Sequence, residues 1–399
     1  MSMKQSNVES ENYQRENGIL AALDFHYGEA KGHFSEVEYQ LLSTGELATQ
    51  FAGDREHSLE ARILLRDFPF KMFCVSQPTA ECRQTLCVAF KCPSNTSAHE
   101  VGNEFAAFLS LLTRRRIFAL KQTRCDGLPV EHQPRSFFDR SEGQLQSSTT
   151  IQQEEIALLL MTIQKLDAKT SSGFVLAMRL YHTAVSLILA EPQIAYLLLV
   201  MSIETISGVT ENETNTVDED WEQYLDSCYK GWRTHCDIST PELKASVVQM
   251  LTKSAYRTLR KFRSFIQINL PEKFWTETSD DGKPVWWSFV YDVNGRAVVE
   301  NDRGIQPWEK WEPKDLKRIL DAVYASRSKF VHEGAPFSAE IVLGLSPEIP
   351  FDAAVSMMNK MMNGSTNNPL TIPSLITFER MVNYSLMGFL RTRSSPEKG

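Results

Sequence analysis

Two residues whose types suit phosphodiester chemistry lie near residue 330. Arg327 and His332 stand five residues apart in the segment RSKFVHEG. A histidine titrates near neutral pH, so its imidazole can take a proton from a ribose hydroxyl or deliver one to a leaving oxygen. An arginine stays charged and can stabilise a crowded, negatively charged phosphorane. If the two side chains meet, they could form a phosphodiester-cleaving pair.

The residues before the pair predict an amphipathic helix that positions it. Arg327 lies eleven residues after Leu316 and falls close to the angular position of the core face, so its guanidinium is expected to point inward. On an ideal helix His332 stands about 140° from Arg327. The two side chains can converge only if the helix unwinds near Val331, which Gly334 would permit. The predicted core face consists of Leu316, Ile319, Leu320, Val323 and Tyr324.

An inward-pointing arginine needs a partner, because burying an unpaired charge is costly. Glu204 is the predicted partner, since a carboxylate near the end of an otherwise apolar helix itself requires a cation. Two alternatives remain open. Glu204 could face solvent at a helix end. Arg327 could serve only as a structural bridge to Glu204 or to helix-end carbonyls, while His332 caps the helix.

The longest apolar tract, residues 174–206, is long enough to be weighed as a membrane span. Glu191 and Pro192 divide it into halves of about sixteen residues, each short for a bilayer crossing. Titratable side chains also occur inside both halves, where a membrane would penalise them. We therefore predict two core helices joined by a tight turn, with Pro192 at the first position of the second helix and no contact with membranes.

Composition and charge exclude several classes of protein. The 399 residues carry 42 Lys and Arg against 50 Asp and Glu, a formal net charge of -8, so no broad basic surface for long duplexes is expected. Residues 1–19 are polar, are predicted to be disordered and lack the basic and apolar regions of a secretion signal, which favours a cytoplasmic protein. Seven cysteines without CxxC pairs are expected to be free thiols.

Compositional changes along the chain predict a small α+β domain at residues 20–130, followed by an all-α helical bundle at residues 153–392. In the first domain, KMFCVSQP and RQTLCVAFKCP predict short strands, and residues 97–116 repeat apolar side chains at helical spacing. Residues 131–152 are polar and turn-rich, as expected of a linker. A Trp-rich insertion at residues 275–311 contains the Asn-Gly dipeptide typical of a β-hairpin turn.

A basic helix is predicted between Pro241 and Leu270, with no acidic residue after Lys244. Its apolar face is expected to hold Leu251, Ala255, Leu259, Phe262 and Ile266. Its positive side chains recur at helical spacing and could guide an RNA backbone toward the pair. A merely solvated charged face is the simpler alternative. The predicted RNA-binding residues are Lys253, Arg257, Arg260 and Lys261.

The segment RSKFVHEG resembles the hallmark of the HEPN superfamily of helical bundles, especially its Apea-like branch. In that family an Arg is followed after four to six residues by a His near the end of a late helix, as at Arg327 and His332. The segment VMSIETI, which contains Glu204, is similar to the helix in which such proteins often place a glutamate. Members often carry Asn, Asp or His directly after the Arg, where this chain has Ser328. The resemblance covers about residues 155–390.

This resemblance implies a metal-independent endoribonuclease with Arg327 and His332 as catalytic residues, Glu204 and Ser328 as supporting residues, and no cofactor. It also implies a homodimer in which two Arg and His pairs line one cleft, and products that end in a 2′,3′-cyclic phosphate and a 5′-hydroxyl. Related proteins act in host defence, so a toxin or antiviral effector with an antitoxin or regulatory partner is expected. The alternative is a non-catalytic HEPN-like module that dimerises or binds nucleotides and regulates a partner.

Other chemistry-bearing residues predict no second site. His99 and Glu100 begin an HExxH pattern, but Asn103 stands where the second histidine should be. Four cysteines between residues 74 and 92 lack the spacing of a zinc site. The arginines at 114–116 are explained by the dipole of the helix that they follow. The residues expected to have a satisfied core role are Tyr181 and His182.

Overall fold

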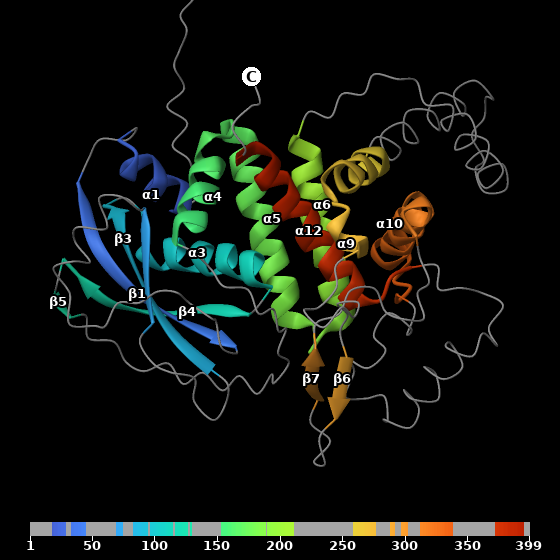
Figure 1. Ribbon diagram of the computed structural model, residues 1–399, viewed down its shortest axis with the longest axis horizontal. Helices are drawn as coiled ribbons and strands as arrows, with labels where there is room; N and C mark the ends of the chain where they lie inside the picture. The colour runs from blue at the N-terminus through green and yellow to red at the C-terminus, as the bar shows by residue number, and fades with distance from the viewer. Residues whose placement is uncertain are drawn as a thin grey trace, which may run out of the picture. The chain divides into compact units, whose positions relative to one another are not determined.

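The fold, obtained as a computed structural model, is mixed α+β (Figure 1). Helices predominate, and the described strands form one five-stranded antiparallel sheet and one two-stranded hairpin. The chain divides into two compact units. The structure describes residues 18–28, 33–44, 69–74, 83–94, 96–114, 116–126, 128–129, 153–188, 190–210, 258–276, 288–291, 297–301, 312–337 and 372–394.

The five-stranded sheet belongs to the first unit and has the strand order β2-β3-β1-β4-β5. Its strands are β1 (Phe34–Thr44), β2 (Phe70–Cys74), β3 (Arg83–Pro93), β4 (Ile117–Cys125) and β5 (Leu128–Pro129). β1 lies between β3 and β4 and pairs antiparallel with both. Buried Val37, Tyr39 and Leu41 alternate along β1 with polar neighbours, which is the period of a strand with one buried face. β2 and β3 confirm the two predicted strands, whereas β1 and β4 were not predicted from the sequence.

The helical part of the first unit packs onto this sheet. The ring of Phe105 stacks on Phe70 of β2, with ring centroids 4.4 Å apart. Gly102 admits the ring of Tyr39, because a Cβ there would lie 3.0 Å from that ring. α1 begins at Gly18, inside the segment predicted to be disordered, and α3 confirms the helix predicted from its apolar spacing. The helices are α1 (Gly18–His26), α4 (Gln153–Lys165) and the first residues of α3 (Ala98–Thr113) and α5 (Ala168–Leu187).

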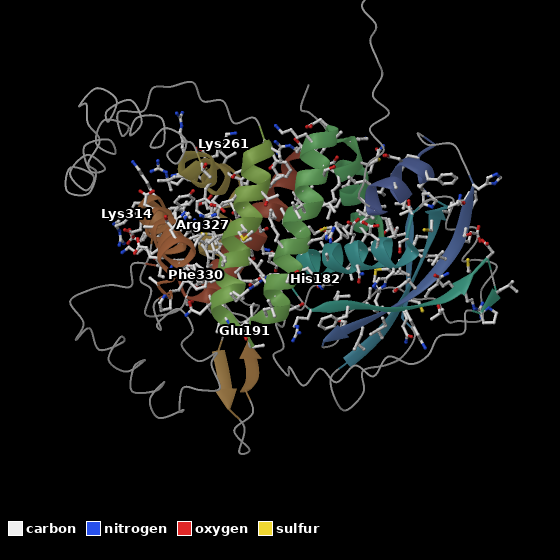
Figure 2. The ribbon with its side chains drawn as sticks, turned by 180° about the vertical axis from the view of Figure 1, so that it is seen from behind. His182, Glu191, Lys261, Lys314, Arg327 and Phe330 are labelled. Carbon is white, nitrogen blue, oxygen red and sulfur yellow. The ribbon has the colours of Figure 1, made fainter. Side chains whose placement is uncertain are left out.

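The described part of the second unit consists of helices and one hairpin. A tight turn at Glu191 and Pro192 joins α5 to α6, with Pro192 at the first position of α6 as predicted (Figure 2). The strands β6 and β7 pair antiparallel, which confirms the predicted hairpin, although its turn lies outside the described residues. The elements are the rest of α3 and α5, α6 (Pro192–Val209), helical residues 258–269, α9 (Lys273–Thr276), β6 (Ser288–Tyr291), β7 (Ala297–Asn301), the 3-10 turn Pro313–Asp315, α10 (Leu316–Glu333) and α12 (Leu375–Ser394).

Among the residues that the structure describes, α6 is the one helix whose length and apolar composition would allow it to cross a membrane. A core helix of a soluble protein has the same composition. α6 packs against α12 and α10, and its side chains Tyr196, Leu199 and Ile203 are fully buried. These contacts favour the predicted role of α6 as a core helix over a membrane span.

α12 passes very close to the helical residues 258–269. At Gly388 a Cβ would lie only 2.0 Å from the carbonyl oxygen of Asn269, so no side chain fits at this position. One residue further along α12, Phe389 packs against Phe265, with ring centroids 5.5 Å apart. The absence of a side chain at Gly388 thus lets two backbones touch, and the aromatic pair beside it fills the adjoining space.

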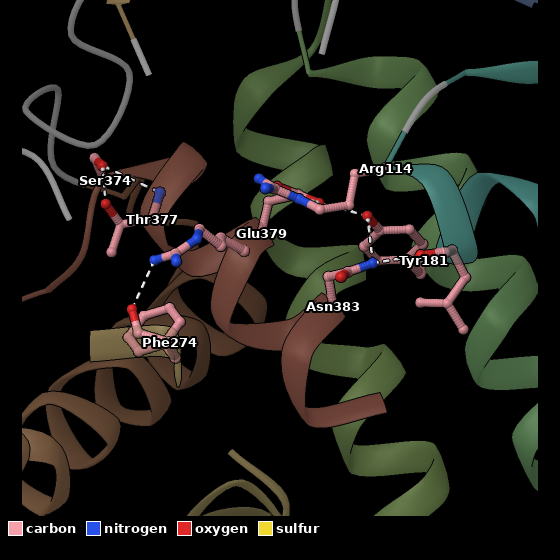
Figure 3. Close-up of polar contacts among 9 residues, drawn as sticks. Arg114, Tyr181, Phe274, Ser374, Thr377, Glu379 and Asn383 are labelled. Atoms are coloured by element: carbon pink, nitrogen blue, oxygen red, sulfur yellow. Dashed lines mark hydrogen bonds and ion pairs between the residues drawn. The ribbon is translucent and has the colours of Figure 1, made fainter. Parts of the chain in front are cut away.

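α12 also takes part in a buried charged network (Figure 3). Arg114 donates from Nη2 to the Glu379 carboxylate at 2.7 Å, and the two side chains are 8% and 0% exposed. Tyr181 donates its hydroxyl to the same carboxylate, which confirms its predicted core role. Asn383 donates to the Tyr181 oxygen at 3.2 Å and to the Leu111 carbonyl at 2.6 Å. The prediction that Arg114 acts only through the dipole of α3 is wrong, because its guanidinium neutralises a buried carboxylate.

Candidate functional site

α10 carries both residues of the candidate pair and is helical along its whole length. Arg327 lies in its penultimate turn and His332 in its last turn. Leu316 and Tyr324, which were expected on the core face, are only half-buried. The centre of the predicted core face is confirmed by the fully buried side chains Ile319, Leu320 and Val323.

Gly334 closes the end of α10. Its φ of 67° lies in the left-handed region, and its N–H donates to the carbonyl of Lys329. The N–H of Ala335 reaches the same carbonyl at 3.3 Å. Glycine favours this helix-ending arrangement, which ties the last turn down instead of loosening it. α10 therefore does not unwind near Val331, which was the condition for the pair to converge, and the two residues stay about 140° apart around α10 in one chain.

Arg327 pairs with Glu204 of α6. Its Nη2 donates to Oε2 of Glu204 at 3.0 Å, which confirms the predicted partner. The side chains of Arg327 and Glu204 remain 22% and 13% exposed. Among the described residues, nothing accepts a hydrogen bond from the buried Nε of Arg327. The guanidinium is therefore held by Glu204 through Nη2, while its Nε is buried and the side chain as a whole stays 22% exposed.

The surroundings of this ion pair are partly desolvated. Burial raises the pKa of the Glu204 carboxyl, and the charge of Arg327 together with hydrogen bonds from Arg327 and Tyr324 offsets only part of that rise. Burial and the negative charge of Glu204 raise the pKa of the Tyr324 hydroxyl. The guanidinium carbon of Arg327 lies 5.9 Å from the centre of the Tyr324 ring, within range of a cation–π contact. A carboxylate and an aromatic ring thus both restrain the arginine.

His332 and Ser328 occupy other sides of α10. His332 is exposed in the last turn, where a basic side chain faces the negative end of the helix dipole. Ser328 follows Arg327 directly and is half-buried. One chain presents Arg327 and His332 on different sides of the same helix end.

The predicted RNA-binding residues are only partly within the described chain. Lys253 and Arg257 lie outside the described residues, and Arg260 is half-buried. Lys261 is exposed, and its ammonium group donates to the Gly208 carbonyl near the end of α6 at 3.4 Å. A lysine at that place faces the negative end of the α6 dipole, so Lys261 has a local role that needs no RNA.

The described part of the basic helix packs against α10. Arg263 lies 3.2 Å from the carboxylate of Asp321, and the ring of Phe262 packs against Tyr324 with centroids 5.8 Å apart. These two contacts join the helical residues 258–269 to the helix that carries Arg327. The predicted apolar face is confirmed at Leu259, Phe262 and Ile266, while Leu251 and Ala255 lie outside the described residues.

Gln193 of α6 binds the backbone that follows α10. The N–H of Phe337 donates to Oε1 of Gln193 at 2.8 Å, and Nε2 of Gln193 donates to the Phe337 carbonyl at 3.3 Å. The Phe337 ring packs against Phe330 of α10 and Tyr196 of α6, with centroids 5.1 and 4.7 Å away. The sequence carries no signal for this contact, because a glutamine in the first turn of a helix is normally solvated.

Within the described residues, no three His, Cys, Asp or Glu side chains are placed to hold a metal ion. Cys87 and Cys92 are buried, and burial raises the pKa of the Cys92 thiol to about 11. His99, which begins the incomplete HExxH pattern, is hydrogen-bonded through Nδ1 to the Tyr39 hydroxyl at 2.5 Å. Cys82 and the side chain of Cys74 lie outside the described residues.

Comparison of the chain with protein-family models, with curated proteins and with solved structures finds no match. The resemblance of RSKFVHEG and VMSIETI to the HEPN superfamily therefore stays a prediction from the sequence. A function has to be argued from the groups that α6 and α10 hold together.

Proposed function

We propose that this chain is a metal-independent endoribonuclease of the HEPN type, with an α+β N-terminal domain before a HEPN-like helical bundle. One observation carries the proposal. Arg327 is fixed by Glu204 yet 22% exposed, and it lies five residues before the exposed His332 on the same helix. A restrained cation and a solvent-facing imidazole are the groups that phosphodiester cleavage by proton transfer needs.

The proposed site forms between two copies of the chain, so that Arg327 of one copy and His332 of the other face one phosphate. One imidazole takes the proton of a ribose 2′-hydroxyl, and the freed oxygen attacks phosphorus. The bond from phosphorus to the 5′ oxygen breaks, and a second imidazole protonates that leaving oxygen. The arginines stabilise the negative charge on the phosphorane. The products are a 2′,3′-cyclic phosphate and a 5′-hydroxyl.

Supporting residues and partners belong to the same proposal. Glu204 orients Arg327, and Ser328 supplies a polar group beside it. With a net charge of -8, the chain must contact RNA locally. In the cell we propose a cytoplasmic toxin or antiviral effector, which its N-terminal domain or a separate antitoxin restrains. The residues proposed to guide the RNA backbone are Lys253, Arg257, Arg260 and Lys261.

The test is cleavage of single-stranded RNA in the presence of EDTA. Wild-type protein should yield 5′-hydroxyl products, and Arg327→Ala and His332→Ala should each lower the rate by about 100-fold or more, since each removes one group that acts on the phosphate. Lys329→Ala is the matched control, because Lys329 is exposed between them on α10, and it should keep the wild-type rate. Equal cleavage by all four proteins would eliminate the proposal.

A non-catalytic helical module that dimerises or binds nucleotides is favoured by a different observation. Arg327 already has a carboxylate partner, and the regular end of α10 keeps His332 on another side of the helix. This candidate predicts a folded protein that does not cleave RNA and whose partner binding survives His332→Ala. Calorimetric titration with nucleotides, together with the molar mass in solution, would identify it.

A further inference from the structure

We infer that Gln193 is a positioning residue, which sets the location of His332 by clamping the end of α10 to α6. The inference rests on the proposed ribonuclease function and deepens it. It concerns the segment from Phe330, which Figure 2 labels on α10, to Phe337, with His332 between them.

His332 lies between two fixed points. Before it, the ring of Phe330 packs against Phe337 with centroids 5.1 Å apart. After it, the side chain of Gln193 holds both the N–H and the carbonyl of Phe337. Between these points, the left-handed Gly334 closes the last turn of α10. The contacts turn this short segment into a closed loop with His332 inside it.

Among the described residues, the packing of the Phe337 ring on Tyr196 and Phe330 and the cap at Gly334 also hold this loop. The last carbonyl groups of a helix lack partners within the helix, and helix ends fray. Val331, His332 and Glu333 are all exposed, so side-chain packing does not fix them. The two hydrogen bonds from Gln193 add a polar restraint on the backbone that follows these exposed residues, beside the packing of the Phe337 ring.

α6 therefore restrains both residues of the pair, Arg327 directly through Glu204 and His332 indirectly through Gln193 and Phe337. Glu204, eleven residues after Gln193, pairs with Arg327, whereas Gln193 pairs with Phe337, ten residues after Arg327. This order of contacts means that α6 and α10 run antiparallel. The two cross-links are about 16 Å apart along α6, at about 1.5 Å per residue. Together they prevent α10 from rocking against α6 and so fix the imidazole relative to the guanidinium.

The test compares Gln193→Ala, Gln193→Glu and Ile194→Ala in the full-length protein. Gln193→Ala removes both hydrogen bonds and should lower kcat about 10- to 100-fold with less than about a threefold change in KM, because small displacements of a reacting group are that costly. Gln193→Glu keeps the acceptor for the Phe337 N–H but loses the donor. Its kcat should therefore lie between that of the wild type and that of Gln193→Ala. Ile194 is exposed next to Gln193, and its variant should keep the wild-type kcat.

Hydrogen–deuterium exchange gives a second readout that needs no activity. Gln193→Ala should speed exchange of the amides in residues 331–337 and leave α12 protected, because the loss of the clamp is local. A merely structural role of Gln193 would instead lower the melting temperature and speed exchange throughout the second unit.

The outcomes separate this inference from the proposed function. A graded loss of kcat together with faster exchange at residues 331–337 supports it. Full kcat in Gln193→Ala, or a loss of kcat without faster local exchange, overturns the inference and leaves the nuclease standing. A wild-type protein that does not cleave RNA overturns the proposed function and the inference with it.

Discussion

Two arginine–glutamate pairs in the second unit share their chemistry and differ in their surroundings. Arg114 and Glu379 are 2.7 Å apart with side chains 8% and 0% exposed, whereas Arg327 and Glu204 are 3.0 Å apart and 22% and 13% exposed. The first pair is sealed in the core, and solvent reaches the second. The difference separates an ion pair closed off from solvent from one that, under the proposed function, also meets RNA.

The two arginine–glutamate pairs also differ in hydrogen bonding. Tyr181 adds a donor to Glu379, and Asn383 in turn fixes Tyr181. Burial, with the charge of Glu379, raises the pKa of Tyr181 well above its usual range, so the phenol stays protonated as a donor. At the other pair, the buried Nε of Arg327 finds no acceptor in the part of the chain that the structure describes. Because that Nε is buried, an anionic ligand could reach only the exposed part of the guanidinium, whose side chain is 22% exposed.

Removing the core glutamate should have the largest effect on stability. Glu379→Ala leaves the buried guanidinium of Arg114 without its counter-charge, which should lower the free energy of unfolding by about 3–5 kcal/mol. Urea denaturation measures this loss. Thr392→Ala, at an exposed position of α12, is the control and should change it by less than about 0.5 kcal/mol. A loss below about 1 kcal/mol for Glu379→Ala would place the two pairs in one class.

Removing the glutamate of the candidate site should cost less. Glu204→Ala should lower the free energy of unfolding by about 1–2 kcal/mol, because Arg327 can direct part of its charge to solvent. The same variant should impair RNA cleavage, since the guanidinium loses the group that orients it. Denaturation and cleavage are measured on one preparation, with Thr205→Ala on the next residue of α6 as the control. Equal losses of stability for Glu204→Ala and Glu379→Ala would contradict the comparison.

The smallest expected effect is the pH dependence of the partly buried pair of Arg327 and Glu204. Burial raises the pKa of Glu204 in the folded state, so the folded protein binds this proton more readily than the unfolded chain. Such a group contributes stability that is present at low pH and is lost as the pH rises through the folded pKa. The free energy of unfolding of the wild type relative to Glu204→Gln should therefore be larger near pH 4 than near pH 7. A difference that shrinks on acidification would mean that Arg327 outweighs burial.

Local periodicity predicted much of the helical structure. Apolar spacing indicated α3 and the core face of α10, and Pro192 marked the start of α6 because its ring suits the first helical turn. Glu204 was predictable as the partner of Arg327, since two opposite charges on apolar helix faces stabilise each other. Strand β1 shows where this reasoning stopped, because its buried residues alternate with Glu and Gln, so that the average composition conceals the pattern.

Contacts between distant segments could not be predicted from spacing. Arg114 and Glu379 are 265 residues apart, and Gln193 and Phe337 are 144 residues apart. A run of arginines has the same sequence pattern whether its members are solvated or buried. Only the tertiary structure therefore reveals the buried pair of Arg114 and Glu379. Gly334 was assigned the opposite effect, because glycine in the left-handed region ends a helix cleanly as well as permitting it to loosen.

The contact of two backbones at Gly388 limits how the second unit can rearrange. If α12 slid by one residue along the helical residues 258–269, a neighbouring side chain would meet the carbonyl oxygen of Asn269, where even a methyl group does not fit. Gradual gliding of these helices is blocked, so they either keep their register or come apart. A conformational switch in this region would have to detach α12, and detachment would break the pair of Arg114 and Glu379 in the same step.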